Sequence, residues 1–260
     1  MNFNESKLSE TYITDDVLKK LLTALPAHMI LVGGQALAFW VERFGVDAGG
    51  EAHISLDVDF LGRRDDVRTL AELISGNAKY PPERSMTILC GQAVIVQQDA
   101  GTFMSIDVIH RIGNMNTEAV ARRAVEAELS DVAGTFLVMH PLDVLLSRAE
   151  NYRGIQNKQT PNGRRQVILA IDVAKRYIES MVAGDEKRVL KAIERVAEIA
   201  RSPAGAYARE HDVDIYDAIR PDDLRKIVSN ENFIEHRLPR LEREISEYIG
   251  FASDDLPSPK

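Results

Sequence analysis

Hydrophobic residues follow two different spacings along the first 140 residues. Short apolar runs predict strands, and segments in which apolar residues recur every three or four positions predict helices. The predicted strands lie at 29–32, 53–62 and 135–140 and in successive runs within 85–110, with turns near Gly91 and at 98–101. The predicted helices lie at 14–25, 35–44, 64–76 and 117–129. This alternation of strands and helices indicates an α/β lobe.

The pattern changes at Pro141, which suits the first turn of a helix. Helical spacing then dominates, over 141–153, about 163–183, about 185–201 and 232–249. We therefore expect an α+β fold with two domains. Residues 1–138 would form a mixed β-sheet lobe with flanking helices, and residues 139–260 an all-helical C-terminal domain.

Composition narrows the class of protein. The chain has 260 residues and a formal net charge of −8, which argues against coating nucleic acid through bulk positive charge. Its single cysteine, Cys90, excludes an internal disulfide and a cysteine-rich metal site. The polar N-terminus lacks a signal-peptide pattern, and the apolar runs are shorter than a membrane span. We expect a soluble cytoplasmic protein without a membrane partner.

Two acids interrupt the apolar run "ISLDVDF" at 54–60. Side chains two apart on a strand share a face, roughly 6.6–7 Å apart, so Asp57 and Asp59 project together while Leu56, Val58 and Phe60 face the core. Aspartate is disfavoured in strands, and two on one face repel each other unless a cation intervenes. The pair predicts a Mg²⁺ site; the alternative is the solvent face of a half-exposed sheet.

A third carboxylate comes from "FMSIDVIH". There Asp107 lies on the face opposite Met104, Ile106 and Val108. If this strand is a neighbour of 53–62, three carboxylates meet on one side of the sheet. Three such groups suit two Mg²⁺ ions about 3.5–4 Å apart, the arrangement used in phosphoryl and nucleotidyl transfer.

The stretch "LVGGQALAFW" places Gly33 and Gly34 between a predicted strand and a predicted helix. Such a corner lets a phosphate approach the backbone and meet the free N–H groups of the helix N-terminus. Gln35 follows and is a candidate donor to a phosphate or a base. A tight packing turn is the alternative. The Lys-Ser/Thr of a P-loop and the dinucleotide fingerprint are both absent.

Basic residues outnumber acidic ones by seven to four over 141–180, although the whole chain is acidic. The alternatives are a solvated helical face and a phosphate-binding wall. The candidates for the wall are Arg148, Lys158, Arg164 and Arg165.

Together, "LVGGQAL", "SLDVDFLG" and "SIDVIH" resemble the DNA polymerase β-like nucleotidyltransferase superfamily. The pairing of "GGQALAFW" with "SLDVDF" is most similar to bacterial abortive-infection and toxin-type nucleotidyltransferases. The resemblance covers roughly 29–110 and implies a nucleotidyltransferase-like lobe. It implies that Asp57 and Asp59 hold two Mg²⁺ ions, and that Asp107 binds the catalytic ion and helps to deprotonate the acceptor. Gly33, Gly34 and Ser55 would contact the triphosphate.

The function implied is Mg²⁺-dependent transfer of a nucleoside monophosphate from an NTP, with ATP as a candidate, to an acceptor. RNA or tRNA ends, a protein hydroxyl and a small molecule such as an antibiotic all remain open as acceptors. An antitoxin-like protein is a candidate partner. Two alternatives stand beside this enzyme: a catalytically silent nucleotide-binding module of the same fold, and a structural interaction protein whose acids face water.

Overall fold

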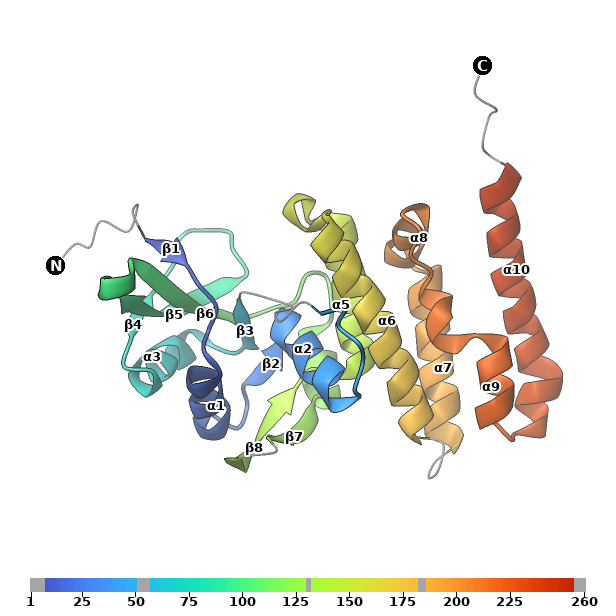
Figure 1. Ribbon diagram of the computed structural model, residues 1–260, viewed down its shortest axis with the longest axis horizontal. Coiled ribbons are helices and arrows are strands. Elements are labelled where there is room, and N and C mark those ends of the chain that lie inside the picture. Colours follow the sequence, from blue (N-terminus) through green and yellow to red (C-terminus); the bar gives the residue numbers. More distant parts are fainter. Residues whose placement is uncertain (1–7, 51–56, 130–131, 182–185, 255–260) are drawn as a thin grey trace, which may run out of the picture. The chain divides into compact units, whose positions relative to one another are not determined.

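The computed structural model describes residues 8–50, 57–129, 132–181 and 186–254 (Figure 1). In these ranges eight strands form one mixed sheet in the order β4-β5-β6-β3-β2-β8-β7, with β1 paired to β6. The strands are β1 (Ser9–Glu10), β2 (Ile30–Val32), β3 (Val58–Leu61), β4 (Asn77–Lys79), β5 (Leu89–Gln97), β6 (Thr102–Ile109), β7 (Val125–Leu129) and β8 (Val132–Val138).

Helices precede, connect and follow these strands. The α-helices are α1 (Asp15–Ala24), α2 (Gly33–Arg43), α3 (Arg64–Leu73), α4 (Thr117–Arg123), α5 (Pro141–Gly154), α6 (Pro161–Met181), α7 (Glu186–Arg201), α8 (Pro203–Glu210), α9 (Pro221–Ile227) and α10 (Leu238–Asp254). Short 3₁₀ turns are η2 (Gln98–Ala100), η3 (Gln156–Lys158) and η4 (Ile215–Ile219), and a π-helical turn is η5 (Phe233–Arg237).

The chain forms two compact units, Met1–Ala170 and Ile171–Lys260. The first contains the sheet, and in the described part of the second every regular element is helical. The predicted domain boundary between residues 138 and 139 coincides with the change from strands to helices, because β8 ends at Val138 and α5 follows it. The division into compact units falls later, within α6.

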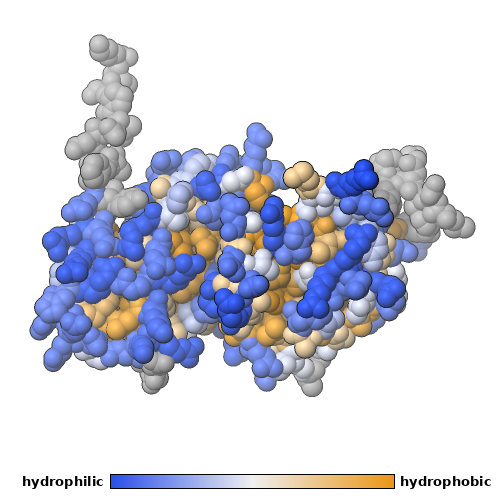
Figure 2. All heavy atoms as spheres, turned by 180° about the vertical axis from the view of Figure 1, so that it is seen from behind, coloured by the Kyte–Doolittle hydropathy of each residue, from blue (hydrophilic) through white to orange (hydrophobic). Residues whose placement is uncertain are grey.

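Parallel pairing joins β3 to β6 and β2 to β8, whereas β2 and β3 are antiparallel. Val58 and Phe60 of β3 are fully buried, as their alternation in sequence predicts. Their face of the sheet is covered by α3, whose Val67 lies beside Gly91. On the face seen in Figure 2, hydrophilic side chains are interspersed with apolar ones. The sheet therefore has one apolar face that is packed against a helix, and Asp59 lies on the other.

The predicted helix over 117–129 is wrong in its second half. The helix α4 ends at Arg123, and Val125–Leu129 is β7, antiparallel to β8. Ala, Glu and Leu favour a helix by propensity, but burial of Ala127 against β8 stabilises the extended form.

The predicted turn near Gly91 is also wrong, because Gly91 lies inside β5 next to a shift in register. A Cβ at this position would be 2.6 Å from the carbonyl oxygen of Lys79. The glycine therefore permits the close approach of β4, a strand that the sequence pattern did not predict. The short helices α8 and α9 were likewise not predicted.

None of the helices described is both long enough and apolar enough to cross a membrane.

Candidate functional site

Two of the three predicted aspartates stand side by side on neighbouring strands. Asp59 of β3 lies directly opposite Asp107 of β6 in the parallel register. Both project from the face opposite to the fully buried Val58 and Ile106. Asp57 immediately precedes β3, and its charge raises the pKa of both other carboxyl groups. The structure therefore pairs two of the three selected carboxylates, and Asp57 lies within electrostatic reach of both.

The environment of Asp59 disfavours its charged form. Burial first, and then the charges of Asp107 and Asp57, raise the pKa of this carboxyl to about 6. Two cations act in the opposite direction, Arg148 more strongly than Lys158. Burial and the neighbouring carboxylates together therefore outweigh the effect of these two cations on the pKa of Asp59.

The glycine corner lies against this cluster. Gly33 has a φ of +70°, and a Cβ there would be 2.0 Å from the Oδ2 atom of Asp59. This closeness arises because β2 pairs with β3 so that Val32, the residue before Gly33, lies opposite Asp59. A side chain at position 33 would occupy the space of the carboxylate. The glycine and the aspartate, 26 positions apart in sequence, thus form one site.

The first turn of α2 starts at this same corner. Its N-cap is Val32, and no side chain caps the helix. Gly34 is buried and Gln35 is half-buried in this turn. The N–H groups of a helix N-terminus attract anions. The predicted phosphate contacts of Gly33, Gly34 and Gln35 thus fall beside the aspartates.

Arg148 of α5 is buried in the same region, with 7% of its surface exposed. Its Nη1 atom donates to Oε1 of Gln166 at 3.2 Å and its Nη2 atom to Oγ of Ser147 at 3.2 Å. Its Nε atom has no hydrogen-bond partner among the described residues. Burial lowers the pKa of Arg148, and the charge of Asp59 raises it. This guanidinium is therefore the main counter-charge of Asp59.

Asp107 has neighbours that the sequence analysis did not select. Nε2 of Gln92, its cross-strand partner on β5, donates to its Oδ1 atom at 2.8 Å. Burial raises the pKa of Asp107, this hydrogen bond lowers it, and Asp57 and Glu10 raise it again. Ser105 donates a hydrogen bond to Glu10 on the same side. A polar residue within the apolar run "CGQAVIV" was the only sequence signal for Gln92, because its partner depends on the register.

The remaining predicted residues are more dispersed. Lys158 in η3 is half-buried and within electrostatic reach of Asp59. Arg164 and Arg165 lie half-buried in the first turns of α6, and Arg165 donates a hydrogen bond to the carbonyl oxygen of Ala48. The described charges that shift the pKa of Asp59 or Asp107 do not include those of Arg164 and Arg165. Ser55 lies outside the described residues.

A divalent cation is compatible with this donor set. Within the part of the chain described, no group of three or more His, Cys, Asp or Glu side chains is arranged to hold a metal ion by itself. Mg²⁺, however, commonly takes one or two protein carboxylates and completes its shell with water and substrate phosphates. The paired Asp59 and Asp107, with Asp57 nearby, supply such a partial shell. The donor set is therefore compatible with a metal–phosphate complex whose shell the protein completes only in part.

Comparisons with known proteins give little further information. No model of a known protein family matches the chain. An F-box/LRR-repeat protein of Arabidopsis thaliana is 30% identical over an alignment of 132 residues that covers 47% of this chain. The match spans 22% of the length of that relative. The similarity is therefore confined to part of each protein, and it assigns no family to this chain.

Proposed function

We propose that the protein is a Mg²⁺-dependent nucleotidyltransferase, which moves a nucleoside monophosphate from an NTP to an acceptor. One observation carries the proposal: Asp59 and Asp107 lie in register on adjacent strands, with Gly33 pressed against the Asp59 carboxylate. A glycine turn formed only for packing would not require a carboxylate beside it. An acidic face exposed to solvent would not require a glycine corner. Their combination supports a phosphate site beside a cation site.

In this proposal Asp57, Asp59 and Asp107 would hold Mg²⁺, and the bound ion would neutralise the charge of the triphosphate and of the leaving pyrophosphate. The backbone at Gly33 and Gly34 and the N-terminus of α2 bind phosphate oxygens.

Two cations have different tasks. Lys158 is half-buried and within electrostatic reach of Asp59, and we assign it the task of pairing with the triphosphate. Arg148 is buried and already bonded to Gln166 and Ser147. We assign Arg148 the task of keeping Asp59 ionised and oriented, in addition to its predicted part in nucleotide binding.

Asp107 is the proposed base. Gln92 occupies its Oδ1 atom, which leaves Oδ2 to receive the proton of the acceptor hydroxyl. The acceptor oxygen forms a bond to the α-phosphorus as the bond between that phosphorus and the pyrophosphate oxygen breaks.

The test uses α-labelled NTPs, Mg²⁺ and a panel of acceptors: tRNA, a protein mixture and aminoglycosides. The intact protein is expected to transfer label, and the double variant Asp57→Ala/Asp59→Ala is expected to lose transfer by at least about 1,000-fold because both metal ligands are gone. A matched variant, Asp65→Ala/Asp99→Ala, removes two exposed carboxylates elsewhere and should retain activity.

Transfer that survives in the Asp57/Asp59 variant would contradict the metal assignment. NTP binding without any product would instead support the silent nucleotide-binding module.

A further inference from the structure

The sheet ends in an edge strand that nothing described covers. β7 pairs only with β8, and in the described chain its backbone forms no other hydrogen bond. In an antiparallel ladder only part of the backbone groups bond to the neighbouring strand, and the others on an edge strand point outward. β7 therefore offers free N–H and C=O groups along Val125–Leu129.

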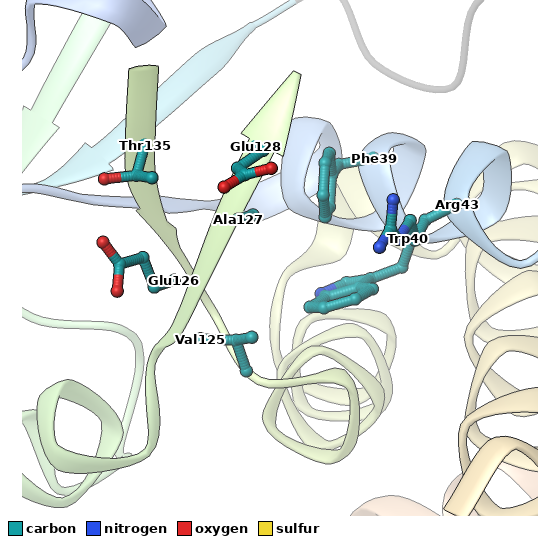
Figure 3. A pocket seen from close by; sticks show the side chains of 8 residues that line it. All are labelled: Phe39, Trp40, Arg43, Val125, Glu126, Ala127, Glu128 and Thr135. Carbon is teal, nitrogen blue, oxygen red and sulfur yellow. The ribbon is translucent and has the colours of Figure 1, made fainter. Parts of the chain in front are cut away.

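A cavity of about 400 Å³ lies along this edge (Figure 3). Its lining combines aromatic rings, exposed charges and the strand itself: Phe39, Trp40, Arg43, Val125, Glu126, Ala127, Glu128 and Thr135. Glu126 and Glu128 are exposed, and neither forms an ion pair with a described residue. The edge therefore carries two exposed carboxylates, and the exposed Arg43 of α2 lines the same cavity.

The two faces of the edge differ in chemistry. Ala127 pairs with Phe136, and the ring of Phe136 contacts that of Phe39 at 5.4 Å between centroids. Phe39 therefore lies on the Ala127 face. Glu126 and Glu128 project from the other face, because side chains alternate along a strand. Figure 3 shows Glu126 and Phe39 on opposite sides of β7. A strand added to β7 would meet acids on one face and, on the other, aromatic rings together with Arg43 of α2.

A second copy of the chain is a poor occupant of this edge. Two β7 strands paired antiparallel about Ala127 would place Glu126 of each copy opposite Glu128 of the other. Like charges directly opposite each other destabilise a sheet. A strand with lysine or arginine at those positions would instead be attracted.

We propose that β7 is a docking edge for an extended segment of a partner protein, in which basic residues alternate with apolar ones. The basic side chains pair with Glu126 and Glu128, the apolar ones pack towards Phe39, and the backbone extends the sheet. The same two glutamates disfavour self-association, so they select the partner as well as attract it. This inference does not depend on the proposed transferase activity.

The test measures binding of fluorescent peptides to the full-length protein by anisotropy. The probe alternates lysine and valine, and its counterpart alternates glutamate and valine. The intact protein should bind the lysine peptide and not the glutamate peptide. The variant Glu126→Lys/Glu128→Lys should reverse this preference and weaken binding of the lysine peptide by about tenfold.

Two controls separate docking from general attraction to an acidic protein. The variant Glu83→Lys/Glu231→Lys changes the net charge equally at exposed positions away from β7, and it should bind the lysine peptide as the intact protein does. A lysine peptide that is N-methylated at alternate residues should bind at least about tenfold more weakly, because strand addition needs its N–H groups.

Three outcomes would overturn the proposal. They are equal loss of binding in the two charge-reversal variants, full binding of the methylated peptide, and dimers in sedimentation experiments that disappear in the Glu126/Glu128 variant.

Discussion

At Gly33 the absence of a side chain has two separate effects. The φ of +70° is strained for any residue with a Cβ, and a Cβ would also reach within 2.0 Å of the Asp59 carboxylate. Gly45 shares only the first effect, since its φ is +61° and nothing lies within 4 Å of its added Cβ. The two positions therefore separate backbone strain from displacement of the carboxylate.

We expect Gly33→Ala to lower nucleotidyl transfer by about 100-fold, because it shifts Asp59 from its position opposite Asp107. Gly45→Ala should cost about 1 kcal/mol of stability and leave transfer unchanged. Steady-state kinetics and urea unfolding of both variants provide the check. Equal losses of activity in the two variants would mean that strain alone is responsible.

The carboxyl of Asp59 should also make stability depend on pH in metal-free protein. Its pKa in the fold is raised to about 6 from 3.8, so the folded state holds its proton more tightly than the unfolded state does. The charged form is therefore a cost to folding. That cost is absent below about pH 4, grows between pH 4 and 6, and is complete above that range, at up to about 3 kcal/mol.

Asp59→Asn removes this titration. The free energy of unfolding of the variant relative to the intact protein should rise by up to about 3 kcal/mol from pH 4 to pH 7. Urea unfolding in EDTA at several pH values measures it, and a difference that does not vary with pH would contradict the assignment.

At the scale of elements, a bidentate ion pair connects α4 to α5. Nε and Nη2 of Arg123 donate to Oδ2 and Oδ1 of Asp143 at 2.9 and 2.8 Å. The Asp143 side chain is 1% exposed, whereas that of Arg123 is 44% exposed. Because α5 carries Arg148, this contact helps to position the counter-charge of Asp59.

Replacement of Arg123 by Met leaves a buried carboxylate without its ion-pair partner. We expect a loss of about 2–3 kcal/mol, below the usual cost of breaking a buried pair because Arg123 is partly solvated. Arg122→Met is the matched control, since Arg122 pairs with Glu118 at 3.8 Å on the surface and should cost less than about 0.5 kcal/mol. Chemical unfolding distinguishes them, and equal losses would count against a structural role of the pair.

At the scale of the whole molecule, the protein is acidic, yet we propose that it binds an NTP, which is itself a polyanion. The net charge of −8 opposes this, so binding has to rely on local cations and on Mg²⁺. A saturating NTP with Mg²⁺, at 100 times its dissociation constant, should raise the melting temperature by about 5–10 °C. NTP with EDTA should give little change, and so should NTP with Mg²⁺ added to Asp57→Ala/Asp59→Ala. An equal rise in EDTA would show that the carboxylates do not hold a metal for the nucleotide.

Local patterns in the sequence determined much of this protein. The alternation in "ISLDVDF" and "FMSIDVIH" placed Asp59 and Asp107 on the face of the sheet opposite Val58 and Ile106, because successive side chains of a strand face opposite ways. Helical spacing and Pro141 located the start of the helical half. His140 caps α5, with its Nδ1 atom accepting from the Leu142 N–H at 3.2 Å, which agrees with a helix that begins at Pro141.

Only the tertiary structure decided which segments meet. It placed Asp59 opposite Asp107, Gln92 on the Asp107 carboxylate and Arg148 in a buried position beside Asp59. It also made Val125–Leu129 a strand although the residues favour a helix. The physical reason is that propensity and periodicity depend on neighbours in the chain, whereas strand pairing, register and burial depend on contacts between distant segments. The sequence therefore identified the charged residues of the candidate site, but it did not identify the residues with which they interact electrostatically.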